Sequence, residues 1–434
     1  METNSRGGLS LSKRTNSGHQ TTIYALGHDI LCLIFSFLDL LDLGRCSGVC
    51  KYWDTVISSS KLLQTLYSKQ KLQQTSSSSF DMSTSLGRSV KAHLQKLAMD
   101  RHRFSLQEGQ IDVLQWKGHS VGVDQCRMKM GFILTGVGDK VMRLWSAESY
   151  KCLDEYSIPD SAPLIDFDFD ESKVVGLVGT RLCIWRRNEK RSIFSSREGL
   201  FSRGLCMRYV DPEAAVGCED GTVRFFDMYS RNCSQIVKMH AGPVTCLALS
   251  DDHLIISGSS LGSVTLSDLS SDQQVKGLRT MDSGGIRTLC FNPSSYLVFA
   301  GTTAGYASCW DLRSMRTLWN NRVSPNVIYS MHHLRSDKST LVVGGIDGVL
   351  RFLDQDTGKV FSRCIMNETS NVSNSAIDSY GVVRIRKAKR LSEDARIDLL
   401  PRTCRPPIRC LAVGMQKVVS VHNEKNIRLW KFNI

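Results

Sequence analysis

The stretch Gly138–Trp145, GDKVMRLW, decides the fold, because variants of it recur along the chain at a nearly constant interval. Each copy joins a small turn to a short apolar strand that ends in an aromatic or similar residue, often followed by an acid. The further copies are GTRLCIW (179–185), EDGTVRFFD (219–227), LGSVTLSD (261–268), AGYASCWD (304–311), IDGVLRFLD (346–354) and EKNIRLW (424–430). The strands end at positions 145, 185, 226, 267, 310, 353 and 430, so successive copies lie 40, 41, 41, 43, 43 and 77 residues apart.

A repeat of this length indicates a propeller. A period of about 40–45 residues with one such strand per repeat is typical of blades built from four antiparallel strands. The last interval contains one further period plus an insertion. We therefore expect a mainly β fold, a seven-bladed β-propeller over residues 110–434. Such a ring is a rigid binding disc without chemistry of its own.

The two ends of the repeat region are expected to close the ring together. The last repeat stops after the strand Asn426–Phe432, one strand short of four. Ahead of the first repeat, Ile111–Trp116 alternates apolar and polar residues as a strand does. We expect Ile111–Trp116 to supply the outer strand of the final blade, which leaves no open sheet edge.

An insertion at about residues 364–406 separates the sixth and seventh blades. Since the strands of a blade cannot absorb extra residues, we expect the insertion to lie in a loop. It is rich in serine at first, then basic over Arg384–Arg390 (RIRKAKR), and finally contains proline. The basic run fits a solvated loop best, and a nuclear-localisation or nucleic-acid patch is the alternative.

Composition excludes several classes of protein. The chain has 434 residues, a formal net charge of +13 and 15 cysteines without a CxxC pair. We expect reduced, mostly buried thiols, no metal site and no cofactor. No run of about 18 apolar residues occurs, so no membrane partner is expected. Because no Gly-rich phosphate loop, HExxH or GxSxG motif occurs, we do not expect an enzyme.

The region before the propeller divides into three parts. Residues 1–22 are polar, which predicts a disordered tail. Because this tail lacks the apolar core of a signal peptide, we expect the protein in the nucleus, the cytoplasm or both. Residues 23–59 form a compact helical module. Residues 60–109 are a helical and polar linker, with a loose tract at Gln73–Ser79 and an amphipathic helix over Val90–Met99.

The helical module has an apolar stripe with few partners of its own. Ile30, Leu31, Ile34, Phe35 and Leu38 follow helical spacing, Asp39 is placed to cap a second helix, and Val49, Cys50 and Trp53 mark a third. About 30 residues are too few to fold alone on a core of their own. The module is therefore expected to pack on an apolar partner.

This module resembles the F-box, and the repeats resemble WD repeats. The positions that carry the F-box likeness are Leu26, Asp29, Ile34, Phe35, Leu38, Leu43, Val49, Cys50, Lys51 and Trp53. Two departures are Gly27 in place of the usual proline and a single residue between Lys51 and Trp53. Taken together, the chain resembles the F-box/WD-repeat proteins of plants. The resemblance also implies a structural hydrogen-bond relay in the first blade, formed by His119, Thr135, Asp139 and Trp145.

The resemblance implies a non-catalytic substrate-recognition subunit of an SCF-type ubiquitin ligase. Its F-box would bind a Skp-type adaptor, which joins a cullin, and its propeller would bind the protein substrate. The residues expected to contact the adaptor are Leu26, Ile30, Leu31, Ile34, Phe35, Leu38, Val49 and Trp53. Two alternatives are a protein-interaction scaffold without a ligase role and a nuclear protein that binds nucleic acid through the basic insertion, although nucleic acid is not the partner that we expect.

The first inner strand of each blade predicts where a substrate binds. Aligned on their apolar positions, these strands place their second residue near the top of the central channel. That residue is Arg203, Arg287 or Arg409 in blades three, five and seven, and Tyr329 in blade six. Arginine binds phosphate or carboxylate through paired hydrogen bonds. These four residues predict a site for an acidic or phosphorylated substrate, as in phosphodegron-reading members of the family, unless the arginines pair with nearby acids or only meet solvent.

Overall fold

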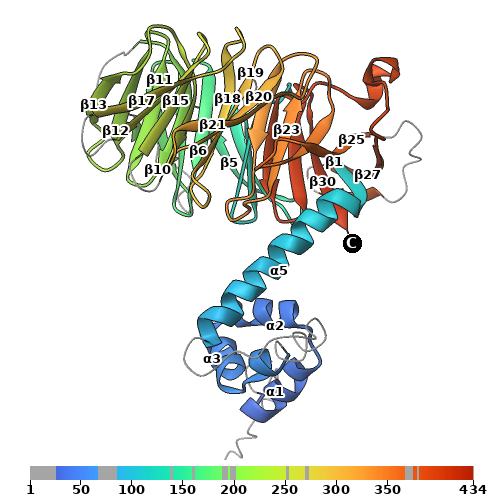
Figure 1. Ribbon diagram of the computed structural model, residues 1–434. Helices are drawn as coiled ribbons and strands as arrows, with labels where there is room; N and C mark the ends of the chain where they lie inside the picture. Colours follow the sequence, from blue (N-terminus) through green and yellow to red (C-terminus); the bar gives the residue numbers. More distant parts are fainter. Residues whose placement is uncertain are drawn as a thin grey trace, which may run out of the picture. The chain divides into compact units, whose positions relative to one another are not determined.

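The computed structural model divides the chain into two compact units, Met1–Asp100 and Arg101–Ile434, and each is described by itself (Figure 1). The residues that the structure describes are 26–66, 86–136, 140–158, 162–187, 194–195, 202–250, 254–268, 273–366, 375–378 and 381–433. The tail at residues 1–22 and the Gln73–Ser79 tract lie outside them. Within these ranges no helix is both long enough and apolar enough to cross a membrane.

The first unit contains the helices expected from the sequence. They are α1 (His28–Ser36), α2 (Leu40–Ser47), α3 (Lys51–Ser59) and the first part of α5 (Leu86–Glu108). The Asp39 carboxylate accepts a hydrogen bond of 2.7 Å from the Asp42 backbone N–H, so the predicted cap is confirmed. The Cys50 thiol caps α3 in the same way, accepting from the Trp53 N–H at 3.5 Å. Helix α5 is longer than the predicted helix over Val90–Met99.

The second unit is built from antiparallel sets of four strands, in which each strand pairs with the next along the chain. The first three sets are β2 (Gln125–Lys129), β3 (Phe132–Gly136), β4 (Val141–Ser146) and β5 (Cys152–Ser157); β6 (Leu164–Phe169), β7 (Lys173–Val178), β8 (Arg181–Arg186) and β9 (Phe194–Ser195); β10 (Gly204–Val210), β11 (Glu213–Cys218), β12 (Thr222–Asp227) and β13 (Cys233–Lys238). Each set is a blade of the propeller.

Three further sets follow in the same way. They are β14 (Val244–Leu249), β15 (Leu254–Ser259), β16 (Ser263–Asp268) and β17 (Gln273–Arg279); β18 (Ile286–Asn292), β19 (Leu297–Thr302), β20 (Tyr306–Asp311) and β21 (Arg316–Arg322); β22 (Ile328–His332), β23 (Thr340–Gly345), β24 (Leu350–Asp354) and β25 (Val360–Met366). The last set combines both ends of the unit: β28 (Cys410–Gly414), β29 (Lys417–Val421), β30 (Asn426–Asn433) and β1 (Gln110–Lys117).

The ring closes as the sequence predicted. Strand β1 pairs antiparallel with β30 over its whole length, from Gln110 opposite Asn433 to Lys117 opposite Asn426. The first strands of the blades neighbour one another in the order β2, β6, β10, β14, β18, β22, β28 and back to β2. Apolar side chains fill the space between neighbouring blades; Trp116, Trp145 and Leu429, for example, share one cluster between the last blade and the first. These first strands therefore surround a common axis.

The insertion does not form a loop alone, and this expectation is wrong. Its basic run lies in the strand β27 (Gly381–Arg390), which also pairs with β26 (Ser375–Asp378). One part of β27 pairs with β1, with Lys387 opposite Asp112, and the other pairs with β25, with Lys389 opposite Ile365. The outer strands of two blades otherwise present unpaired N–H and C=O groups, and β27 satisfies both.

As a result the sixth and seventh blades form one ten-stranded sheet. The start of the predicted insertion, residues 364–366, belongs to the outer strand β25. After β27 the chain makes two short turns of 3-10 helix, η2 (Ile397–Leu399) and η3 (Arg402–Cys404), before it enters β28.

Candidate functional site

Helix α1 buries only part of its apolar surface. Leu31 and Phe35 are 0% and 2% exposed, and together with Leu43, Val56 and Ile57 they form the core of the helical module. The Phe35 ring meets the Trp53 ring edge to face, with centroids 5.2 Å apart. Leu26, Leu38 and Trp53 pack partly buried against this core. Leu31 and Phe35, which were predicted to contact the adaptor, are thus core residues that hold the three helices together in the free module.

The other faces of the module stay exposed. Two predicted residues of α1, Ile30 and Ile34, are exposed, and Val49 lies open between α2 and α3. Sequence reasoning missed Leu33, Phe37 and Tyr52, which are also exposed. The sequence contained an indication of these residues, because apolar residues occur on all sides of α1. A helix that is apolar on every side is normally buried on every side, here by a partner protein. We call Ile30, Leu33, Ile34 and Phe37 the α1 surface.

The mouth of the propeller gathers three of the four residues predicted to bind substrate. In β18 and β22 the pairing register shifts at Arg287 and Tyr329, so each residue is a bulge at the start of its strand. Arg409 directly precedes β28 and follows Ile408, as Arg287 follows Ile286 and Tyr329 follows Ile328. The guanidinium carbon of Arg409 lies 4.6 Å from the centroid of the Tyr329 ring, and that of Arg287 lies 6.0 Å from it. Both cations thus lie near the same aromatic ring.

A carboxylate of the first blade adjoins this group. Burial raises the pKa of Asp124 above its ordinary value, although the charges of Arg409 and Arg287 act against that rise. Asp124 therefore lies within the electrostatic reach of both arginines. The mouth group of Asp124, Arg287, Tyr329 and Arg409 comes from four blades and carries a net positive charge while Asp124 is ionised.

Arg203 does not belong to this group, and its prediction needs correction. In the third blade the register shift falls between Gly204 and Cys206, so Leu205 occupies the position that Arg287 has in the fifth blade. Arg203 lies two residues earlier and is exposed ahead of β10. The alignment slipped because glycine replaces the large apolar residue that begins the other strands. A Cβ at Gly204 would come within 2.8 Å of the Leu177 side chain, which explains the glycine.

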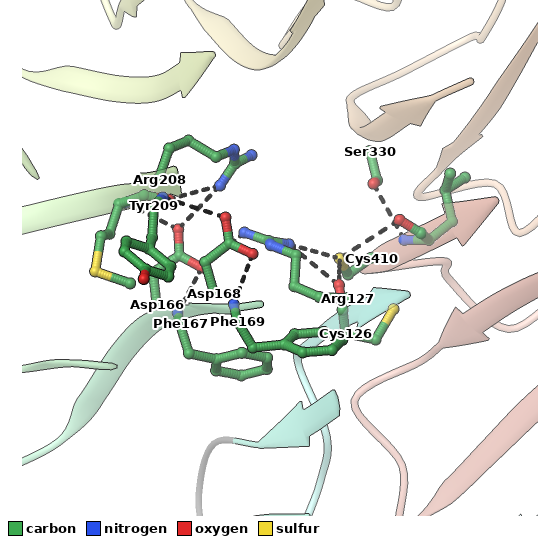
Figure 2. Close-up of polar contacts among 12 residues, drawn as sticks. Cys126, Arg127, Asp166, Phe167, Asp168, Phe169, Arg208, Tyr209, Ser330 and Cys410 are labelled. Atoms are coloured by element: carbon green, nitrogen blue, oxygen red, sulfur yellow. Dashed lines mark hydrogen bonds and ion pairs between the residues drawn. The ribbon is translucent and has the colours of Figure 1, made fainter. Parts of the chain in front are cut away.

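Below the mouth, charged side chains join neighbouring blades (Figure 2). Arg127 donates to the Asp166 carboxylate at 2.7 Å, and Arg208 lies 3.5 Å from the other oxygen of the same carboxylate. Asp166 also accepts from the backbone N–H groups of Phe167 and Met207, at 2.9 and 3.0 Å. Both oxygens of Asp166 are therefore engaged, and this carboxylate of the second blade joins the first blade to the third.

The pKa values of two more groups near this network are lowered. Burial raises the pKa of Asp168, but Lys129, Arg127 and Arg208 outweigh it, so the pKa lies below its ordinary value. Burial and the same two arginines lower the pKa of His332 to about 3, which keeps this histidine neutral. Sequence reasoning did not single out these residues, although the acids of LIDFDF at 164–169 are unusual in a buried strand. The arrangement ties the first strands of neighbouring blades to one another.

The predicted relay of the first blade is present where the structure describes it. The Thr135 hydroxyl lies 2.8 Å from His119 Nε2 and accepts from Trp145 Nε1–H at 2.9 Å; Asp139 lies outside the described residues. The seventh blade has an unexpected version, in which Ser420 bonds Trp430 at 2.8 Å and His422 at 2.8 Å. All of these side chains are buried, so the relays are structural.

Comparisons with known proteins agree with both halves of this description. The F-box-like family matches residues 24–69, and the family described as WD domain, G-beta repeat matches residues 231–268. The chain is 53% identical to the F-box/WD-40 repeat-containing protein At3g52030 of Arabidopsis thaliana, over 95% of each chain.

The chain belongs to the F-box/WD-40 repeat-containing proteins. A more distant likeness covers a smaller part of the chain. The chain is 24% identical to the guanine nucleotide-binding protein subunit beta-like protein 1 of Mus musculus over 134 residues, which are 29% of this chain and 41% of that protein. Membership supports a substrate-adaptor role, because the family joins an adaptor-binding module to a protein-binding propeller and is generally non-catalytic.

Proposed function

We propose that this chain is the substrate-recognition subunit of an SCF-type ubiquitin ligase. In this role the F-box binds a Skp-type adaptor that joins a cullin, and the propeller holds the protein to be ubiquitinated. The observation that carries the proposal is the α1 surface, because a soluble module rarely leaves so many large apolar side chains open without a partner.

The α1 surface is suited to contact with apolar helices. Its four residues are 40% to 82% exposed, and they follow the i, i+3, i+4 and i+7 spacing of one helix face. Val49 and Tyr52, near the start of α3, extend the exposed apolar area. We propose that the adaptor covers these six side chains, whereas Leu31 and Phe35 support them from inside the module.

The mouth group is suited to an anionic part of the substrate. Arg287 and Arg409 converge on Tyr329, and each guanidinium can bind a carboxylate or phosphate with two hydrogen bonds. Asp124 places one negative charge near the two arginines. A bound anion would therefore compete with the Asp124 carboxylate for the charges of Arg287 and Arg409. We propose that an acidic or phosphorylated segment of the substrate binds here.

The alternative of a nucleic-acid protein loses support in the described residues. Arg390 of β27 donates to the main-chain oxygens of Ser105, Leu106 and Gln107 at the end of α5, at 3.3, 3.0 and 2.8 Å. Lys387 of the same strand pairs with Asp112 at 3.0 Å. Lys387 and Arg390 are therefore engaged within the unit, which favours a structural role for these two residues of the run.

Copurification tests the proposal and separates it from a scaffold without a ligase role. The full chain, expressed in plant cells under proteasome inhibition, should capture a Skp-type adaptor and a cullin. The double variant Ile34→Asp/Phe37→Asp should lose both proteins. Ile236→Asp, which also changes an exposed aliphatic residue but lies in the propeller, should retain them. Capture of neither adaptor nor cullin by the unchanged chain would refute the ligase role, whereas equal capture by all three proteins would refute only the assignment of the α1 surface.

A further inference from the structure

The propeller has a second surface at the opposite end of its strands. In the last blade Arg409 precedes β28, whereas the turn Met415–Gln416 follows it, so the mouth and this turn lie at opposite ends of one strand. Around the turn lie Met130, Tyr150, Lys417 and Lys431, which together with Met415 form what we call the turn-face patch. None of these residues takes part in the mouth group or in the network below it.

Two lysines of the patch stand directly opposite each other. Lys417 of β29 is the register partner of Lys431 of β30. On its other side Lys431 is opposite Asp112 of β1, but Lys387 and Asn433 each bond that carboxylate at 3.0 Å. The Lys431 ammonium lies instead 5.0 Å from the centroid of the Tyr150 ring. Among the described residues no carboxylate lies within 4.0 Å of either ammonium.

This pairing is unfavourable in the free chain. Like charges on directly opposite strand positions destabilise a sheet. Burial and the charge of Lys431 lower the pKa of Lys417, and the charge of Glu148 offsets only part of this effect. A carboxylate brought by a partner would relieve the repulsion, because it places an opposite charge next to both ammonium groups.

Exposed methionines adjoin the two lysines. Met130 and Met415 occupy the turns that follow the first strands of the first and last blades, and they are 47% and 42% exposed. The two turns are close neighbours, because a Cβ at Gly414 would come within 2.6 Å of Met128. Methionine side chains adapt their shape to apolar partners and are frequent on such binding surfaces.

We propose that the turn-face patch binds an acidic amphipathic segment of a partner protein. Carboxylates of the segment meet Lys417 and Lys431, and its apolar side chains cover Met130 and Met415. A nucleic-acid backbone fits less well, since it needs a longer track of cations without apolar neighbours. The site is independent of the proposed ligase role, and because it lies at the other end of β28, it binds its partner while the mouth holds a substrate.

Peptide selection on the full chain tests this proposal. A library of random peptides displayed on phage is selected on the immobilised chain, with removal of phage that also bind the variant Lys417→Glu/Lys431→Glu. We expect selected peptides that alternate Asp or Glu with large apolar residues. A labelled copy of such a peptide should bind the double variant about ten-fold or more weakly, a loss of ~1.4 kcal/mol. Its binding should also weaken as salt is raised.

Three controls make the result decisive. Lys338→Glu changes an exposed lysine in the equivalent connection of the sixth blade, and Arg287→Glu changes the mouth; neither should alter peptide binding. Lys417→Gln should weaken peptide binding. It should nevertheless keep or raise the melting temperature of the free chain, because it removes the repulsion between Lys417 and Lys431. The proposal fails if no peptide distinguishes the chain from its double variant, if the selected peptides are basic, or if single-stranded DNA binds the patch and acidic peptides do not.

Discussion

Replacing Ile34 and Phe37 together with alanine should break adaptor binding and leave the chain folded. Both side chains belong to the α1 surface, at 40% and 82% exposure, so the free module does not rely on them for its core. Leu31 provides the contrast, because it lies on the same helix and is fully buried.

The size of the effect follows from the exposed fractions. Complete burial of a large apolar side chain contributes ~1.5–3 kcal/mol. If the adaptor buries all that is exposed, Ile34 contributes ~0.6–1.2 kcal/mol and Phe37 ~1.2–2.5 kcal/mol, scaled from that range by the exposed fractions. The double variant should then bind about 20-fold to 500-fold more weakly.

Biolayer interferometry with a purified plant Skp-type adaptor measures this loss, and circular dichroism melts report folding. Leu31→Ala should unfold the module itself, since emptying a packed leucine site costs about 2–5 kcal/mol. Ile236→Ala should change neither quantity, because Ile236 is an exposed propeller residue. Wild-type adaptor affinity in the folded Ile34→Ala/Phe37→Ala variant would show that the α1 surface is not the adaptor site.

Three further predictions concern the propeller. A chain of residues 118–434 lacks β1 and therefore exposes the edges of β27 and β30. It should be insoluble or have a melting temperature well below that of a chain of residues 86–434. Equal melting temperatures would mean that the ring closes without β1. Arg287→Glu should weaken the binding of an anionic substrate peptide about ten-fold or more, since charge-assisted hydrogen bonds contribute about 1.5–3 kcal/mol. Arg203→Glu should weaken this binding less. Fluorescence anisotropy measures both affinities, and equal losses would contradict the mouth assignment. Stability should fall as pH drops below about 6.5, because the unfolded chain then binds protons that the fold excludes from histidines whose pKa values burial lowers. These histidines are His102, His240, His332 and His422. Urea titrations at pH 7.5 and 5.5 would disprove this if the unfolding free energy were equal at both.

Local and periodic patterns were readable in the sequence alone. The recurring strand and its interval predicted the blades, because every blade needs the same alternation of apolar residues and the same turn chemistry. Ring closure by Ile111–Trp116 followed from counting, since the last repeat lacks one strand. Asp39 was recognisable as a cap because capping depends only on the next three residues.

Contacts between distant segments were decided only by the tertiary structure. The basic run became the strand β27 because two edges far away in the sequence needed hydrogen-bond partners. Strand β10 begins with Gly204 in place of a large apolar residue, so only the observed pairing shows that Leu205 and not Arg203 occupies the mouth position. Leu31 and Ile34 look alike on a helical wheel, and only the packing of three helices shows that one is core and the other surface. The opposition of Lys417 and Lys431 likewise depends on strand register, which a single sequence does not encode in its local pattern.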